Sequence, residues 1–215
     1  MDTQQANVER FNGVAPEWDS DPRRVLMAQK VARAMRTALN PTGQERALEF
    51  GAGTGLVTLL MAPSLAQVTV MDGSAGMLAV LRDKCERKHL TQVEIVEGSV
   101  PAQLPGGPFD IIYSSMTLHH VEDVPGLLRA LALRLTADGR VALADLDAED
   151  GGFHGADVKG VAHHGFDRAT FGKWLRAAGF TDIQFSTAFT VRKERDDGST
   201  HAYPIFLVVA RKARA

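Results

Sequence analysis

Apolar residues along the chain fall into alternating short runs and amphipathic stretches. After Asp21-Pro22, apolar residues recur at helical spacing, and Asn40-Pro41 interrupts this spacing. An aspartate followed by a proline is typical of a helix start, and an Asn-Pro pair is typical of a helix end. The pattern predicts a helix between these two points. Residues 1–20 lack such spacing, and we expect them to be irregular.

From residue 47 onward the pattern repeats as strand, helix, strand. The predicted strands cover 47–50, 68–71, 93–96, 109–113 and 140–144. The predicted helices cover 56–61 and the segments that start at Ser74, Asp123 and Asp167. Such alternation is typical of a parallel sheet with helices on both faces. Near-continuous apolar runs agree with parallel strands that are buried on both sides.

The C-terminal part follows a different pattern. The segments 182–191 and 203–210 both resemble strands, and the charged stretch between them has no helical spacing. Two strands joined without a helix are expected to be antiparallel. The predicted fold is therefore α/β, an open, doubly wound, Rossmann-like and mostly parallel sheet with an antiparallel edge.

Composition narrows the class of protein. The chain has 215 residues and a net charge of −2, which suits a single domain over 1–215 and argues against a nucleic-acid partner. No apolar run approaches the ~20 residues of a membrane span, and the polar start lacks a signal peptide. The single cysteine, Cys85, predicts a reducing compartment. These features indicate a cytoplasmic protein with neither membrane nor nucleic-acid partners.

A glycine-rich turn follows the first predicted strand, in the segment Glu49-Phe50-Gly51-Ala52-Gly53-Thr54-Gly55. Glycines allow the backbone to approach a ligand closely, and the helix start that follows suits a nucleotide cofactor. The dinucleotide fingerprint requires a small residue at position 56, which is Leu56 here. Glu49 suits a cationic ligand such as S-adenosylmethionine (SAM) better than a diphosphate. Asp72, at the end of the second strand, can accept the ribose hydroxyls of either cofactor.

These segments resemble the motifs of class I SAM-dependent methyltransferases. Residues 48–55 resemble their first motif, and 70–74 with Met77-Leu78 resemble the second. Residues 109–115 with Leu118-His119-His120 resemble the fourth-strand segment of small-molecule methyltransferases similar to the quinone-biosynthesis group. The resemblance spans roughly residues 25 to 211. It implies a seven-stranded sheet with an antiparallel last strand, SAM as cofactor and S-adenosylhomocysteine (SAH) as product.

The resemblance also implies cofactor contacts by position. Gly51, Ala52 and Gly53 would line the methionine and ribose, with Glu49 beside them, and Asp72 would take the ribose hydroxyls. The adenine would be flanked by Gly73, Ser74 and Met77 and covered by Gly98, Ser99 and Val100, and Ser114 completes the set. Many relatives carry an acid at the position of Ser99, where either the serine hydroxyl or the backbone would accept from the adenine amino group instead.

Histidines are the candidate general bases. Methyl transfer is an in-line displacement that depends mainly on positioning, and a base is needed only for a protonated nucleophile. His119 follows the fourth strand, whose carboxyl end faces the ligand site in this topology. It is the first candidate for a catalytic residue, followed by its neighbour His120 and by His164. His154 and His163 also lie in the segment around the predicted site.

Two segments are candidates for covering the ligands. Residues 145–166 are polar and glycine-rich and predict a substrate lid lined by Phe153 and Phe166, or else a solvated crossover loop. Within the N-terminal part, 1–40, Phe11 and Trp18 would cap the cofactor or staple the first helix.

We predict no metal site, because Tyr113-Ser114 stands where metal-dependent catechol-type relatives carry an acid. The leading hypothesis is a SAM-dependent methyltransferase acting on an unidentified small molecule. An NAD(P)-dependent reductase, a non-catalytic SAM-binding module and a metal-dependent hydrolase are the alternatives. The sequence leaves open the acceptor atom and the choice between monomer and homodimer.

Overall fold

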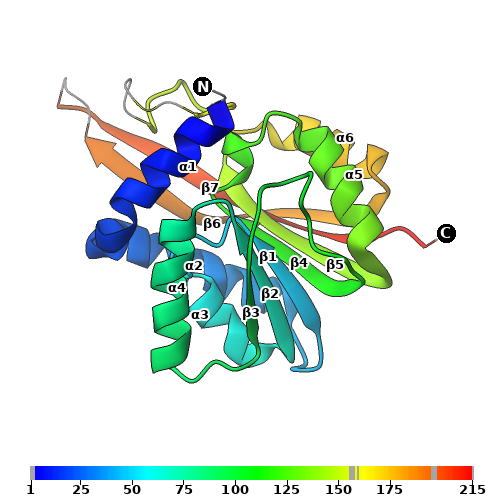
Figure 1. Ribbon diagram of the computed structural model, residues 1–215. Helices are drawn as coiled ribbons and strands as arrows, with labels where there is room; N and C mark the ends of the chain where they lie inside the picture. Colours follow the sequence, from blue (N-terminus) through cyan, green and yellow to red (C-terminus); the bar gives the residue numbers. More distant parts are fainter. Residues whose placement is uncertain (1–2, 155–157, 159, 195–197, 215) are drawn as a thin grey trace.

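The computed structural model describes residues 3–154, 158, 160–194 and 198–214, which form a seven-stranded sheet (Figure 1). The strands are β1 (Arg46–Phe50), β2 (Gln67–Asp72), β3 (Val93–Glu97), β4 (Phe109–Ser115), β5 (Leu135–Leu146), β6 (Phe180–Glu194) and β7 (Thr200–Lys212). Their order is β3-β2-β1-β4-β5-β7-β6. The first five are parallel, and β7 is antiparallel to both β5 and β6.

This arrangement confirms the predicted fold class. The last two strands form the predicted antiparallel edge, in which β7 lies beside β5 inside the sheet and β6 is the outermost strand. The physical reason is that β7 is the more apolar of the two strands, so it fills the buried place beside β5.

Helices cover both faces of the sheet (Figure 1). They are α1 (Thr3–Val14), α2 (Pro22–Leu39), α3 (Thr58–Met61), α4 (Ala75–Arg87), α5 (Val124–Arg134) and α6 (Arg168–Ala177), with 3₁₀ turns at Ala15–Ser20, Ala62–Ser64 and Leu118–His120. The helices α2, α3 and α4 share one apolar cluster with the sheet, and α5 and α6 share the other. No helix in the described ranges combines the length and apolar character needed to cross a membrane.

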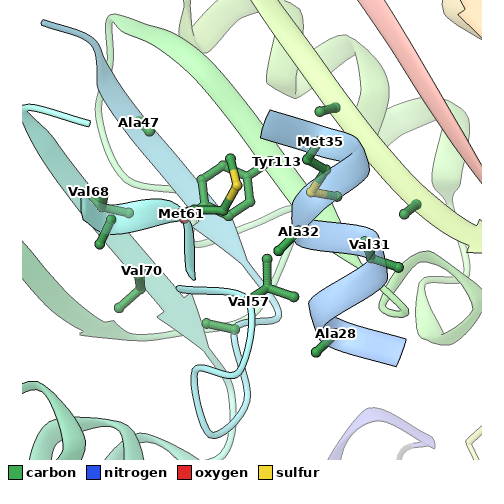
Figure 2. Packing of buried hydrophobic residues seen from close by; sticks show 14 of the residues in the cluster. Ala28, Val31, Ala32, Met35, Ala47, Val57, Met61, Val68, Val70 and Tyr113 are labelled. Atoms are coloured by element: carbon green, nitrogen blue, oxygen red, sulfur yellow. The ribbon is translucent and has the colours of Figure 1, made fainter. Parts of the chain in front are cut away.

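The helix predicted from Asp21-Pro22 forms as α2. The Asp21 carboxylate accepts the backbone N–H of Arg23 at 2.9 Å, and Asn40 ends the helix in the left-handed conformation with φ 44°. The apolar face of α2 packs towards Met61 of α3 and Tyr113 of β4 (Figure 2). This packing anchors α2 across the sheet and places its N-terminus beside the glycine-rich turn.

The N-terminal segment corrects the sequence prediction. Residues 3–14 form α1 and 15–20 form a 3₁₀ turn, where irregular structure was expected. Tertiary contacts hold this segment in place. The Asn12 carboxamide oxygen accepts from the Ser74 hydroxyl at 2.7 Å and from the Gly76 N–H at 2.8 Å. Asp19 accepts from the Thr54 hydroxyl at 2.6 Å. Such contacts stabilise a helix whose own apolar pattern is weak.

Candidate functional site

A cavity of about 790 Å³ lies where the parallel strands β1, β2 and β4 end, and α1 forms part of its wall. This size is in the upper part of the roughly 300–1,000 Å³ range of ligand pockets. Turns after the strands, α1, the start of α2, part of the segment after β5 and the far end of β6 all contribute to the lining. The cavity therefore occupies the place where open α/β sheets bind their ligands.

The glycine-rich turn after β1 borders this cavity. Gly51 has φ +65°, and a Cβ added there would lie 2.1 Å from the Thr117 hydroxyl oxygen, so only glycine fits. Gly53 has φ +54°, and a Cβ added there would meet nothing within 4 Å. Because Gly53 also lines the cavity, its bare backbone leaves room for a ligand to approach closely.

Asp72 closes the opposite side of this turn. Its two carboxylate oxygens accept the backbone N–H groups of Gly53 and Ser74, each at 2.8 Å. Burial raises the pKa of Asp72 above its ordinary value, although these N–H groups act in the opposite direction. Each oxygen retains a lone pair beyond its backbone bond, so the carboxylate can also accept two ligand hydroxyls.

Glu49 is a buried acid beside the turn. Its side chain accepts a 2.6 Å hydrogen bond from the Thr58 hydroxyl, and the residue is 2% exposed while lining the cavity. Burial raises its pKa to about 8, and the charge of Asp72 acts in the same direction. No cation pairs with Glu49 among the described residues. A buried carboxyl of this kind fits a positively charged ligand, which would stabilise its ionised form.

The predicted cofactor residues come together around the cavity, with one exception. Those expected at the adenine line it: Gly73, Ser74, Met77, Gly98, Ser99 and Val100. Ser74 also caps α4 by accepting the Met77 N–H at 3.1 Å. Ser114 lies behind the wall, fully buried, and donates to the Phe50 carbonyl at 2.7 Å. Its neighbour Ser115 lines the cavity instead.

His119 is held by a carboxylate that the sequence analysis had placed in the lid. Its ring Nδ1 lies 2.7 Å from Asp145 Oδ1, and both side chains are buried. The backbone N–H groups of His119 and Leu146 donate to the same carboxylate at 3.3 and 2.8 Å. Burial alone would raise the pKa of Asp145, but the His119 imidazole and these N–H donors hold it below its ordinary value.

This pairing fixes the chemistry of the imidazole. An ionised Asp145 accepts the Nδ1 proton, so Nε2 of the neutral ring is left as an acceptor. His119 lines the cavity beyond the end of β4. Asp145 itself lies in β5, which runs to Leu146 and so extends two residues into the predicted lid.

Two further histidines surround His119. The ring centroids of His120 and His154 lie 4.1 and 5.0 Å from that of His119. His120 Nδ1 lies 2.7 Å from the Gly160 carbonyl oxygen. Burial lowers the pKa of His120 to about 4 and that of His154 to about 3. Both rings are therefore neutral near pH 7.

These two histidines should make the folded state sensitive to acid. In the unfolded chain they take up protons near pH 6.5, whereas in the folded chain they stay neutral down to about pH 4. The free energy of unfolding should therefore fall as pH drops from 6.5 towards 4, by about 1 kcal/mol per histidine, because solvent screens part of the effect. Urea unfolding at pH 7 and pH 5 measures this difference, which should shrink in His120→Gln and His154→Gln. The exposed control His164→Gln should keep the parental difference between pH 7 and pH 5. If His120→Gln and His154→Gln showed the same difference as this control, the prediction would be wrong.

Other predicted residues lie away from the cavity. The His164 side chain is 61% exposed, with Nδ1 3.5 Å from a Glu149 carboxylate oxygen. Phe166 is buried in the core against Phe171, whereas Phe153 lines the cavity as expected. Within the predicted lid, residues 155–157 and 159 lie outside the described residues. In the described part of the chain, no group of three or more histidine, cysteine or acidic residues is arranged to hold a metal.

Comparison with known proteins identifies the family. A family model described as "Methyltransferase domain" matches residues 21–184, and the chain belongs to this family. Its fold is that of class I SAM-dependent methyltransferases, which confirms the resemblance seen in the sequence.

Individual relatives extend this result. A ubiquinone biosynthesis O-methyltransferase of Xanthomonas axonopodis pv. citri is 30% identical over 81% of this chain and 80% of that protein. A demethylmenaquinone methyltransferase of Tropheryma whipplei is 31% identical over 63% of this chain and 56% of that protein. A solved structure, the DhpI-SAH complex, superposes with a TM-score of 0.73 at 19% identity, covering 99% of this chain and 96% of that one. The alignments to the first curated relatives cover about a quarter to just over half of their lengths.

Proposed function

We propose that the chain transfers the methyl group of SAM to a hydroxyl group of a small-molecule acceptor, with His119 as the general base. The observation that carries the proposal is the buried pair of His119 and Asp145, with 2.7 Å between Nδ1 and Oδ1, because His119 lines the same cavity as the glycine-rich turn. Its relatives named for ubiquinone and menaquinone biosynthesis support a small-molecule acceptor.

The residues around the turn fit the donor. Asp72 would accept the two ribose hydroxyls, and the bare backbone of Gly53 would let the methionine portion approach. Glu49 would pair with the positive charge of the donor. Its carboxyl group is buried, and no cation of the described chain pairs with it, so a bound cation would stabilise its ionised form. When bound, SAM supplies a methyl group on a sulfonium, and the sulfur leaves as a neutral thioether.

The remaining groups position and activate the acceptor. Nε2 of His119 would take the hydroxyl proton as the oxygen bonds to the methyl carbon and the carbon–sulfur electron pair passes to sulfur. Asp145 holds the imidazole in the correct tautomer and stabilises the imidazolium that forms. Burial of both side chains excludes water from the pair. A protonated hydroxyl nucleophile is the class of acceptor for which such a base is needed.

Calorimetric titration with SAH, SAM and NADH tests the cofactor class. We expect micromolar binding of the two adenosyl compounds and none of NADH, because Leu56 replaces the small residue that a dinucleotide site requires. Binding of NADH without SAH would contradict the proposal. Production of SAH from SAM with a panel of hydroxyl-bearing compounds then tests turnover, and its absence with every compound would indicate a binding module.

Glu49 should make donor binding release a proton. Its pKa is about 8 in the free protein, so it is mostly protonated at pH 7, and a bound cation would ionise it. Binding of SAH should therefore tighten as pH rises from 6 to 8 and level off above. Calorimetry at pH 7 in two buffers with different ionisation enthalpies measures the protons released. Glu49→Gln should release about one proton fewer than the parent. Equal release would exclude Glu49 as the donor's partner, because the donor's own amino group titrates alike in both.

A further inference from the structure

Two cations in the cavity wall lack an acidic partner. Arg10 of α1 and Lys193 of β6 both line the cavity. The Arg10 Nε atom is buried without a hydrogen-bond partner. The Lys193 ammonium donates a short hydrogen bond to the Phe153 carbonyl oxygen. Neither forms an ion pair with a carboxylate among the described residues. Both side chains are half-buried, and this partial burial lowers the pKa of each, an effect that a negatively charged ligand would offset.

A row of rings connects Lys193 to the proposed base. The Lys193 ammonium lies 4.1 Å from the centroid of the Phe153 ring. The Phe153 and His154 rings are 5.0 Å apart, and the His154 and His119 rings are also 5.0 Å apart. A ligand lying along these three rings would meet a cation at one end and the His119 ring at the other.

The second cation lies at the other end of the same series of rings. The Arg10 guanidinium carbon is 4.5 Å from the centroid of the Phe11 ring, which is 5.5 Å from the His120 ring. However, α1 also carries Asn12, which bonds to Ser74 at the adenine side of the cavity. Arg10 therefore belongs to the element that covers the donor, and Lys193 is the cation on the acceptor side.

The acids whose charges act on Lys193, Glu149 and Asp21, do not form an ion pair with it. Glu149 accepts the Phe153 N–H through Oε2 at 3.0 Å, and its Oε1, 3.5 Å from His164 Nδ1, forms no hydrogen bond and no ion pair with Lys193 among the described residues. Asp21 is bonded to Arg23 at 3.0 Å. The acceptor side of the cavity therefore carries a positive charge that no carboxylate of the described chain neutralises by contact.

We infer that the acceptor is a hydroxyl-bearing acid whose carboxylate or phosphate group binds Lys193 while its hydroxyl faces His119. The inference rests on the proposed function and adds the substrate class. The rings of Phe153 and His154 between the two ends favour a flat, apolar body such as an aromatic ring. Lys193 then acts as a specificity-determining residue that binds and orients the acceptor.

Binding of matched probes to the SAH-saturated protein tests the inference. The probes are hydroxybenzoates, hydroxyphenylacetates and hydroxyphenyl phosphate, each paired with a neutral amide or alcohol of the same shape. At least one acid should bind roughly 10- to 100-fold more tightly than its neutral counterpart, since hydrogen bonds to charged groups have this strength. The carboxylate and phosphate arms distinguish the two kinds of acid. If no acid is preferred, the inference is wrong.

Variants of Lys193 locate the preference. Lys193→Gln should abolish it while leaving SAH affinity unchanged, and Lys193→Arg should retain much of it. Lys173→Gln, which removes an exposed lysine of α6, is the matched control for net charge and should change nothing. If Lys193→Gln still bound the acid more tightly than its neutral counterpart, Lys193 would not be the residue that binds the acidic group. The same conclusion would follow if only Arg10→Gln removed the preference for the acid. A protein that fails to bind SAH at all would instead overturn the proposed function.

Discussion

Replacing His119 with asparagine is expected to lower kcat for methyl transfer to a hydroxyl acceptor by roughly 10²- to 10⁴-fold, the usual contribution of a general base. An asparagine amide can still donate to Asp145 from about the position of Nδ1, so the buried carboxylate keeps its partner. The variant lacks Nε2, the atom that would take the proton. Affinity for SAH should be unchanged, because Asp72 and the turn that it holds form no bond with the His119 side chain.

Two further variants make this result specific. His119→Ala should be less stable than His119→Asn, because it leaves the fully buried Asp145 carboxylate unpaired. His164→Ala removes an exposed histidine away from the cavity and should keep parental activity. Initial-rate measurements of SAH formation, with melting temperatures for each protein, separate these effects. If folded His119→Asn retained the parental kcat, the proposed base would be wrong.

The sequence predicted most of the sheet because strand order follows from local signals. Each parallel strand is a short apolar run bounded by a helix cap or a turn residue, such as Ser74, Asp123 and Asp167. These caps fix where the chain changes direction, and buried parallel strands cannot be solvated on either face. The structure places each predicted strand within a few residues of its expected bounds, apart from longer β5, β6 and β7.

The N-terminal helix was not predictable in the same way. Its residues have little amphipathic pattern, and its position depends on bonds from Asn12 to Ser74 and Gly76, more than sixty positions along the chain. Local spacing carries no information on such contacts. For the last two strands, the more apolar sequence of β7 was the available signal that it lies inside the sheet and that β6 forms the edge.

The donor half of the site was easier to predict than the acceptor half. Gly51, Gly53 and Asp72 lie in one strand-turn-helix unit and at the end of the next strand, so their spacing reveals their proximity. Asp145 lies 26 positions from His119, and only the neighbouring positions of β4 and β5 bring the two together. Its place directly after a predicted strand was the available signal, because the carboxyl ends of adjacent parallel strands meet at one edge of a sheet.

Replacing Asp72 with alanine is expected to weaken SAH binding by roughly 10²- to 10⁴-fold. The carboxylate would lose two hydrogen bonds to the ribose hydroxyls, each worth about 1.5–3 kcal/mol when the acceptor is charged. It would also lose its bonds to the Gly53 and Ser74 N–H groups, which hold the glycine-rich turn against the end of β2. Both losses act on the donor, so binding should weaken without a specific effect on the acceptor.

Asp167→Ala is the matched control for Asp72→Ala. Asp167 likewise accepts a backbone N–H, from Thr170 at 2.8 Å, but it caps α6 on the exposed surface away from the cavity. Both substitutions therefore remove a carboxylate from a helix start or turn, and both should lower stability to some extent through the lost hydrogen bonds. Only Asp72→Ala should lose SAH affinity in calorimetry at matched folded fraction. Unchanged affinity in a folded Asp72→Ala protein would mean that the ribose lies elsewhere, and that Glu49 and Gly53 face a different ligand.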